Sequence, residues 1–260
     1  MPTIQLTVNG PVATVSLNRP EVRNAFNAQM IAELTETFQD LARQDHLRAV
    51  VLEGKGASFS AGADANWMQA SLDFSPEENR ADAMRMSDMF GTIQDLPAPV
   101  IARVHGAALG GGMGLLAACD IVVAAEGTTF GFTETKLGIV PAVISRVVFA
   151  KIGPSWARAL YVTGERFGPE VARQIGLVHW VAPEGDLDAT VQGRVRELLA
   201  SGPGAVRAAK QLALALSEMA AEDVPAYTAR HIAELRASPE GQEGLRAFLE
   251  KRKPAWRDDG

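Results

Sequence analysis

The chain has 260 residues, 47% of them hydrophobic and 22% charged, and its formal net charge is −6. This composition is ordinary for a globular protein, and the length suits one large domain or one domain with a helical appendage. The acidic balance argues against broad binding to nucleic-acid phosphates, because such binding requires a concentrated basic face. A single cysteine, Cys119, excludes an internal disulfide and favours a reducing compartment.

The first residues show no basic segment followed by an apolar run, which is the pattern of a secretory signal. No apolar run reaches the roughly 18 residues of a membrane span. We therefore expect a cytoplasmic protein that does not enter a membrane.

The first half of the chain alternates predicted strands and helices. Residues 4–8 and 12–17 are expected to form a hairpin around Asn9-Gly10, a dipeptide typical of tight turns. Asn27 is the expected N-cap of a helix over 28–44, in which apolar residues recur at helical spacing. The other elements predicted in this half are strands at 48–54, 98–104 and 121–125, a short helix from 65, a mobile connection at 72–78, and a helix from Pro76 to about Gln94.

After about residue 150 the pattern becomes helical, and Gly-Pro pairs at 153–154, 168–169 and 202–203 predict turns. We predict an α/β region over 1–190 and a helical region over 191–260. Leu212, Leu216 and Met219 fall on one face of a tail helix, which could pack on its own subunit or across an oligomer.

Two connections between a strand and a helix share one design, VLEGKGASFSAGAD (51–64) and VIARVHGAALGGGMG (100–114). Glycine permits positive φ and a close approach of the backbone, and the first amides of a helix carry partial positive charge. Two such loops side by side could direct two backbone N–H groups at one oxygen, which would form an oxyanion hole without side chains. Tight packing alone also produces such loops. Gly112, Gly114 and Ala117 fit only a relaxed form of the dinucleotide-binding motif and lie several residues past the strand, and neither loop has the spacing of a P-loop. The chain has no G-x-S-x-G elbow of a serine hydrolase.

Several segments in order resemble the crotonase superfamily, also called the enoyl-CoA hydratase/isomerase family. The matching segments are NRPEVRNAFN (18–27), FSAGAD (59–64), PVIARVHGAALGGG (99–112), ACDIVVAA (118–125), FGFTETKLGIVP (130–141), TGERFGPEVARQIGLV (163–178) and AFLEKRKPAW (247–256). The resemblance spans essentially the whole chain. Residues 59–68 and 141–153 look most like the branch that contains bacterial 3-methylglutaconyl-CoA hydratases.

The resemblance implies an α/β fold in which repeated ββα units form a spiral, followed by a C-terminal helical trimerisation region. It also implies an acyl-CoA thioester as substrate, no metal, no cofactor apart from the CoA of the substrate, and a trimer or a dimer of trimers. By motif position, the N–H groups of Ala63 and Gly111 would be the oxyanion donors, and Glu134 would be the catalytic carboxylate. The implied substrate-binding residues are Arg23, Ala61, Gly62, Asp64, Trp67, Gly110, Gly114, Pro141, Phe248 and Lys251.

The sequence departs from the family pattern at one catalytic position. Many family hydratases hold water between two glutamates, and the first of these positions is Gly114 in this chain. The second is present as Glu134. A lone carboxylate can exchange a proton if burial raises its pKa, but it cannot by itself both polarise water and hold a second proton donor.

Three functions therefore remain open. Hydration could use Glu134 with another polar group or with a water held by the backbone, and the candidates for the polar group are Asn66, Asp73, Glu77 and Glu78. A single glutamate also suffices for moving a double bond from the 3 to the 2 position, so an isomerase is the second alternative. The third is a catalytically weak acyl-CoA-binding protein. We favour the hydratase because the rest of the chain resembles the hydratase branch.

The remaining candidate residues carry weaker predictions. His105 is expected to be a packed or surface histidine, since no partner carboxylate is evident beside it, and the other histidines lack metal-ligand spacing. Arg23 could bind a CoA phosphate or be solvated. Phe248 and Lys251 match positions that in relatives meet the CoA of a neighbouring subunit. The basic run at 250–253 suggests RNA binding as an alternative, which the acidic balance disfavours.

Overall fold

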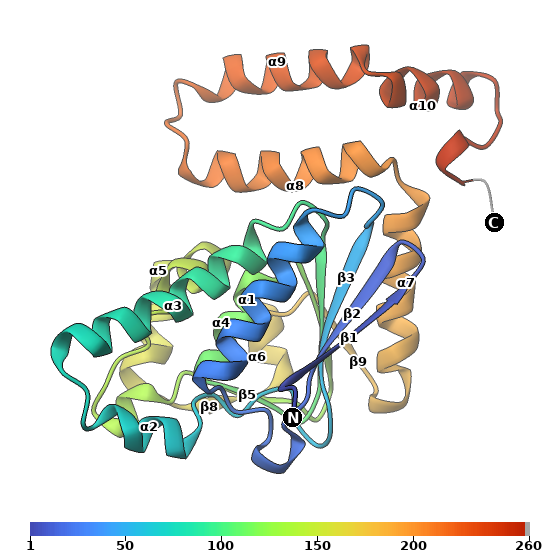
Figure 1. Ribbon diagram of the computed structural model, residues 1–260. Coiled ribbons are helices and arrows are strands. Elements are labelled where there is room, and N and C mark those ends of the chain that lie inside the picture. Colours follow the sequence, from blue (N-terminus) through green and yellow to red (C-terminus); the bar gives the residue numbers. More distant parts are fainter. Residues whose placement is uncertain (258–260) are drawn as a thin grey trace.

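The computed structural model describes residues 1–257 and is built on a six-stranded sheet with helices on both faces (Figure 1). Its strand order is β1-β2-β3-β4-β6-β9, and every neighbouring pair except the β1–β2 hairpin is parallel. The strands are β1 (Ile4–Asn9), β2 (Val12–Leu17), β3 (Ala49–Gly54), β4 (Val100–Val104), β6 (Ile121–Ala125) and β9 (Trp180–Ala182). The predicted hairpin and the three predicted buried strands are confirmed.

Alternate residues of the central strands face two separate hydrophobic clusters. In β3, Val50 and Leu52 belong to the larger cluster, whereas Val51 belongs to the smaller one. Helix α7 (Leu187–Ala200) covers the smaller cluster. The helices that cover the other face are α1 (Ala28–Ala42), α3 (Pro76–Gln94), α4 (Gly111–Ala118) and α5 (Ser145–Thr163). Burial on both faces explains why these strands are continuous apolar runs in the sequence.

A second, three-stranded sheet has the order β5-β7-β8 and connects successive turns of the spiral that the chain forms. Its strands are β5 (Ala107–Leu109), β7 (Thr129–Gly131) and β8 (Arg166–Phe167). Isolated bridges, Phe26 with Ala63 and Ser60 with Ala108, continue the same pairing in other parts of the chain. Each turn therefore contains a strand in the large sheet, a short pairing and a helix. This repeat is the expected ββα spiral, although strands this short were not predicted from periodicity.

Local sequence signals set the ends of the helices. The Asn27 side chain caps α1, as predicted. A capping box between Ser75 and Glu78 begins α3 at Pro76. Gly153, with φ +72°, interrupts α5 where the Gly-Pro pair predicts a turn. The remaining short elements are α2 (Ala65–Ser71), α6 (Pro169–Gln174), η1 (Pro20–Val22), η2 (Glu134–Leu137), η3 (Glu184–Asp186) and η4 (Ala255–Arg257).

The last three long helices form an arm beyond the core, at the top of Figure 1. This helical arm consists of α8 (Pro203–Glu218), α9 (Val224–Ala237) and α10 (Pro239–Leu249). Few of its residues are buried, and Phe248 is 81% exposed. The predicted boundary at residue 190 falls inside α7, which packs on the sheet, so the arm begins later than that boundary. Among residues 1–257, no helix is both long and apolar enough to cross a bilayer.

Candidate active site

A cavity of about 330 Å³ lies where the two glycine-rich loops meet α2, α3 and the segment 133–144. It brings together residues that are far apart in the sequence. The sequence-predicted residues that line it are Ala61, Gly62, Ala63, Trp67, Gly110, Gly111, Glu134 and Pro141. Trp67 is half-buried and also packs against the core, so it serves both as core and as cavity wall.

The two loops touch each other through their glycines. Gly62 has φ +91°, and a Cβ atom there would lie 2.9 Å from the carbonyl oxygen of Leu109. Gly110 has φ +49°, and a Cβ atom there would lie 3.8 Å from the Gly62 Cα and 3.4 Å from Oε1 of Glu134. Positive φ and close backbone approach both require glycine at these positions. The predicted close approach of the loops is therefore present.

Each loop contributes to the cavity lining one residue whose backbone N–H lacks a partner among the described residues. The Phe26 N–H donates to Gly62 (2.7 Å) and the Asp64 N–H donates to Phe26 (2.8 Å), so the Ala63 N–H between them points away from Phe26. Gly111 is the first residue of α4, where the amide lacks a partner within the helix. Within residues 1–257, neither amide donates a hydrogen bond to another group of the chain. Both residues line the cavity.

Glu134 is the first residue of η2 and lines the same cavity. Its Oε2 atom is buried and lacks a hydrogen-bond partner among the described residues. Burial raises the pKa of the Glu134 carboxyl, and a hydrogen bond from its own backbone only partly opposes this effect. A half-buried carboxyl with a raised pKa is suited to accept and return a proton.

Gly114 does not line the cavity, and its role in substrate binding stays a prediction. A Cβ atom at this buried position would lie 2.5 Å from Cγ2 of Ile144 and 2.7 Å from Cζ of Phe90. The packing of α4 turns the residue onto these two side chains. Hydrocarbon therefore fills the space beside the position where many family hydratases carry their first glutamate.

Asp64 does not line the cavity either, and its carboxylate has its partners within the fold. It caps α2 by accepting hydrogen bonds from the N–H groups of Asn66 (2.8 Å) and Trp67 (3.3 Å), and it pairs with Arg19 at 2.7 Å. Burial opposes its ionisation, but Arg19 and the two amides together hold the pKa of Asp64 below its ordinary value. Asp64 stabilises the start of α2 and the loop before it.

Arg23, Phe248 and Lys251 lie outside the cavity. Arg23 is exposed, and its carbonyl oxygen accepts a hydrogen bond from the Ala61 N–H (2.9 Å), so its backbone supports the first loop. Phe248 and Lys251 are exposed at the end of the arm. Their contacts with CoA remain predictions.

None of the four polar candidates for a partner of Glu134 lines the cavity. Asn66, Asp73, Glu77 and Glu78 are all exposed, and Glu78 is held in the capping box of α3. Asp82 lines the cavity instead, and it is only 9% exposed. Sequence analysis missed this residue, although a signal was present. Asp82 lies four residues before Met86 on the buried face of α3, and a charge on an apolar helical face is unusual.

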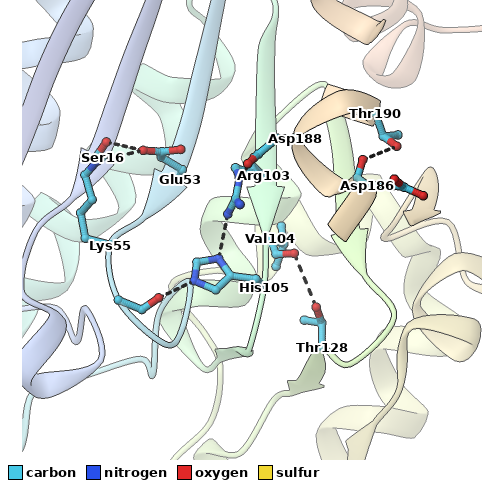
Figure 2. A network of polar contacts seen from close by, with 11 residues as sticks. Ser16, Glu53, Lys55, Arg103, Val104, His105, Thr128, Asp186, Asp188 and Thr190 are labelled. Atoms are coloured by element: carbon cyan, nitrogen blue, oxygen red, sulfur yellow. Dashed lines mark hydrogen bonds and ion pairs between the residues drawn. The ribbon is translucent and has the colours of Figure 1, made fainter. Parts of the chain in front are cut away.

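His105 lies outside the cavity, in a polar network with Arg103 and Asp188 (Figure 2). Arg103 binds Asp188 and also donates to Nδ1 of His105 (3.1 Å). Because Arg103 can only donate, Nδ1 is the acceptor, and Nε2–H donates to the Gly56 carbonyl (2.7 Å). His105 therefore connects the first loop to β4 and, through Arg103, to α7.

Comparison with known proteins identifies a family and relatives for this chain. The family model described as enoyl-CoA hydratase/isomerase matches residues 7–259. A protein of Thermus thermophilus, whose name proposes an enoyl-CoA hydratase, is 37% identical over 247 residues, which are 95% of this chain and 98% of that protein. Carnitinyl-CoA dehydratase of Salmonella typhi is 33% identical over 265 residues and 98% of each chain.

Solved structures agree with the sequence comparison. An enoyl-CoA hydratase from Shewanella pealeana superposes with a TM-score of 0.93 at 37% identity, over 98% of this chain and 96% of that chain. Pseudomonas aeruginosa AtuE superposes with a TM-score of 0.94 at 35% identity, over 98% and 99% of the two chains.

Proposed function

Because the chain belongs to the enoyl-CoA hydratase/isomerase family, we propose that it adds water across the 2,3 double bond of an enoyl-CoA thioester. One observation carries this proposal. A single cavity joins two unpaired backbone N–H groups, those of Ala63 and Gly111, to the buried carboxyl of Glu134. Relatives whose names state hydratase or dehydratase activity at 33–37% identity support the same reaction class.

The two amides would bind the thioester oxygen. When water adds at C3, negative charge moves onto this oxygen and the thioester becomes enolate-like. Donors aimed at that charge stabilise the transition state more than the ground state, and the loss of one such donor typically costs about 2.7–4 kcal/mol of barrier. The inert side chains of the loops are consistent with this function, because the backbone performs it.

Glu134 would move the protons. As a carboxylate it takes a proton from water while the water oxygen bonds to C3, and the protonated carboxyl then delivers a proton to C2 of the enolate. The unpartnered Oε2 atom gives the carboxyl one oxygen for this exchange without the loss of an internal hydrogen bond.

One observation favours the isomerase as a second candidate. Phe90 and Ile144 occupy the space beside Gly114, so the first of the two family glutamates has no equivalent there. Moving a double bond from the 3 to the 2 position needs only one carboxyl, which takes a proton from C2 and returns it at C4.

Isotope incorporation separates the candidate functions. The enzyme is incubated with a 2-enoyl-CoA in ¹⁸O-water and with a 3-enoyl-CoA in deuterated water, and the products are analysed by mass spectrometry. The hydratase predicts ¹⁸O at C3 of the product. Deuterium in the product without ¹⁸O uptake would show that the chain is an isomerase and not a hydratase. If neither label enters, the 3-enoyl-CoA is recovered without conversion to the 2-enoyl-CoA and the acyl-CoA still binds, the chain is a binding protein.

A further inference from the structure

The end of the cavity between α2 and α3 carries polar side chains that the proposed reaction does not use. Ser71 closes α2, and Asn79 and Asp82 lie on the face of α3 that also presents Met86. Trp67 and Met68 form the adjoining apolar wall. A cavity built only for a hydrocarbon chain would not need polar groups at this end.

The hydrogen-bond donors of this group are already used within the chain. Oγ of Ser71 donates to the Met68 carbonyl (2.8 Å). The side-chain amide of Asn79 donates to the carbonyls of Phe74 (3.2 Å) and Ser75 (3.3 Å). These hydroxyl and amide groups therefore offer mainly oxygen acceptors to a ligand.

Asp82 adds a carboxylate to these acceptors. Its side chain is 13% exposed, and Oδ1 accepts a hydrogen bond from Arg85 (2.8 Å), whose own side chain is 59% exposed. The pair balances the local charge, so a neutral donor suits this site better than a full cation. A carboxylate keeps acceptor capacity after one such bond, and closing a plain alkyl chain over it would remove water without replacing the lost hydrogen bonds.

Distances along α3 place Asp82 beyond the reacting atoms. A Cβ atom on Gly111 would lie 3.2 Å from Cε of Met86, which locates Met86 beside the oxyanion site. With a rise of 1.5 Å per residue, Asp82 lies about 6 Å along the axis from Met86 and about 12 Å from Phe90. Asp82 therefore lies about one helical turn of α3 from Met86, which is beside the oxyanion site, and about two turns from Phe90, which fills the space beside Gly114.

We propose that the acyl group of the substrate carries a neutral hydrogen-bond donor, such as a hydroxyl group, a few carbons beyond the double bond, and that Asp82 accepts its hydrogen bond. Asn79 and Ser71 supply further acceptors at the same end of the cavity. The proposal rests on the proposed function only in that the ligand is an acyl-CoA.

Binding of unreactive thioesters tests the assignment directly. Calorimetry compares hexanoyl-CoA, 6-hydroxyhexanoyl-CoA and an analogue that ends in trimethylammonium, with the wild-type chain and with the Asp82→Leu, Asp82→Asn and Asp88→Asn variants. Asp88 is an exposed residue of the same helix outside this cavity, so it controls for the change of helix charge. Binding of hexanoyl-CoA by each variant shows that the variant is folded.

We expect the wild-type chain to bind the hydroxyl-ended thioester roughly 10-fold more tightly than hexanoyl-CoA, the range for a hydrogen bond to a charged group. This preference should disappear in Asp82→Leu, weaken in Asp82→Asn and persist in Asp88→Asn. Equal affinity of the wild-type chain for both thioesters would overturn the proposal, as would an unchanged preference in Asp82→Leu. Tightest binding of the trimethylammonium analogue would overturn the neutral-donor assignment.

The same thioesters test the acyl assignment independently of the proposed hydration. If isotope incorporation shows no hydration but the hydroxyl preference depends on Asp82, the proposed function fails and the acyl assignment holds. If hydration occurs and the preference is absent, the acyl assignment fails alone.

Discussion

At the scale of single residues, Glu134 combines burial with a carboxylate oxygen that nothing within residues 1–257 satisfies. An unpaired buried acceptor normally costs stability, so its presence in a cavity lined by two unpaired amides points to use by a ligand. The glycines at 62 and 110 make this possible, because their backbone geometry lets the two loops meet beside the carboxyl.

Replacing Glu134 by Gln should lower kcat by at least about 100-fold, the low end of general acid–base contributions, because the amide cannot exchange a proton. The dissociation constant of an acyl-CoA should change little, since the shape of the side chain is kept. Steady-state kinetics and calorimetry measure the two quantities. Glu165→Gln, at an exposed glutamate outside this cavity, is the control. Turnover that survives in Glu134→Gln would exclude Glu134 as the proton carrier.

The raised pKa of Glu134 predicts a pH dependence. The carboxylate is the form that accepts the proton from water, so kcat/KM should fall as the pH is lowered through this pKa. Because burial raises the pKa, the acidic limb should lie above pH 4.5, the ordinary value for a glutamate. A pH profile of kcat/KM measures the limb, and a limb at or below pH 4.5 would contradict the assignment.

At the scale of elements, α4 places its small residues where no side chain fits. Gly114 faces Phe90 of α3 and Ile144 before α5, so this one turn of helix holds three parts of the core together. The close packing explains why α4 is almost fully buried. It also leaves no room for a side chain at Gly114, the position at which many family hydratases carry their first glutamate.

Gly114→Ala should lower the free energy of unfolding by about 1–3 kcal/mol, the usual cost of overpacking a core. The added Cβ would lie only 2.5 Å from Ile144 and 2.7 Å from Phe90. Gly127→Ala is the matched control, because a Cβ atom there meets nothing within 4 Å. Urea denaturation of both variants measures the difference. Equal stability of the two would show that the Gly114 site tolerates a side chain.

At the scale of the whole molecule, the helical arm exposes apolar surface in the single chain. None of the residues of α9 is buried, and large apolar side chains at its surface and on α10 remain exposed. Exposed apolar surface of this kind typically marks an interface between proteins. We therefore predict that the arm packs against other copies of the chain, in a trimer or a dimer of trimers.

Light scattering coupled to size exclusion should give the mass of three or six chains. Introducing charge at the arm with Phe248→Asp should shift the mass towards that of one chain, because the exposed ring would lose its apolar partner. Leu72→Asp, at an equally exposed apolar residue outside the arm, should leave the mass unchanged. A monomeric wild-type chain would contradict the prediction.

The sequence by itself determined the features that depend on neighbouring residues. The Asn9-Gly10 hairpin, the Asn27 cap, the apolar runs of the central strands and the glycine-rich loops are all local patterns, and each formed as expected. The motif around Glu134 identified the carboxyl that the structure places in the cavity.

Tertiary structure alone decided where those residues point and which others join them. Gly114 and Asp64 lie near the two amides proposed to bind the thioester oxygen, yet Gly114 packs against Phe90 and Ile144, and Asp64 pairs with Arg19. Asp82 entered the cavity from a helix that carries no motif. The strands of two or three residues formed because a neighbouring turn of the spiral supplied a partner. Each outcome depends on packing between segments distant in the chain, for which a local pattern contains no information.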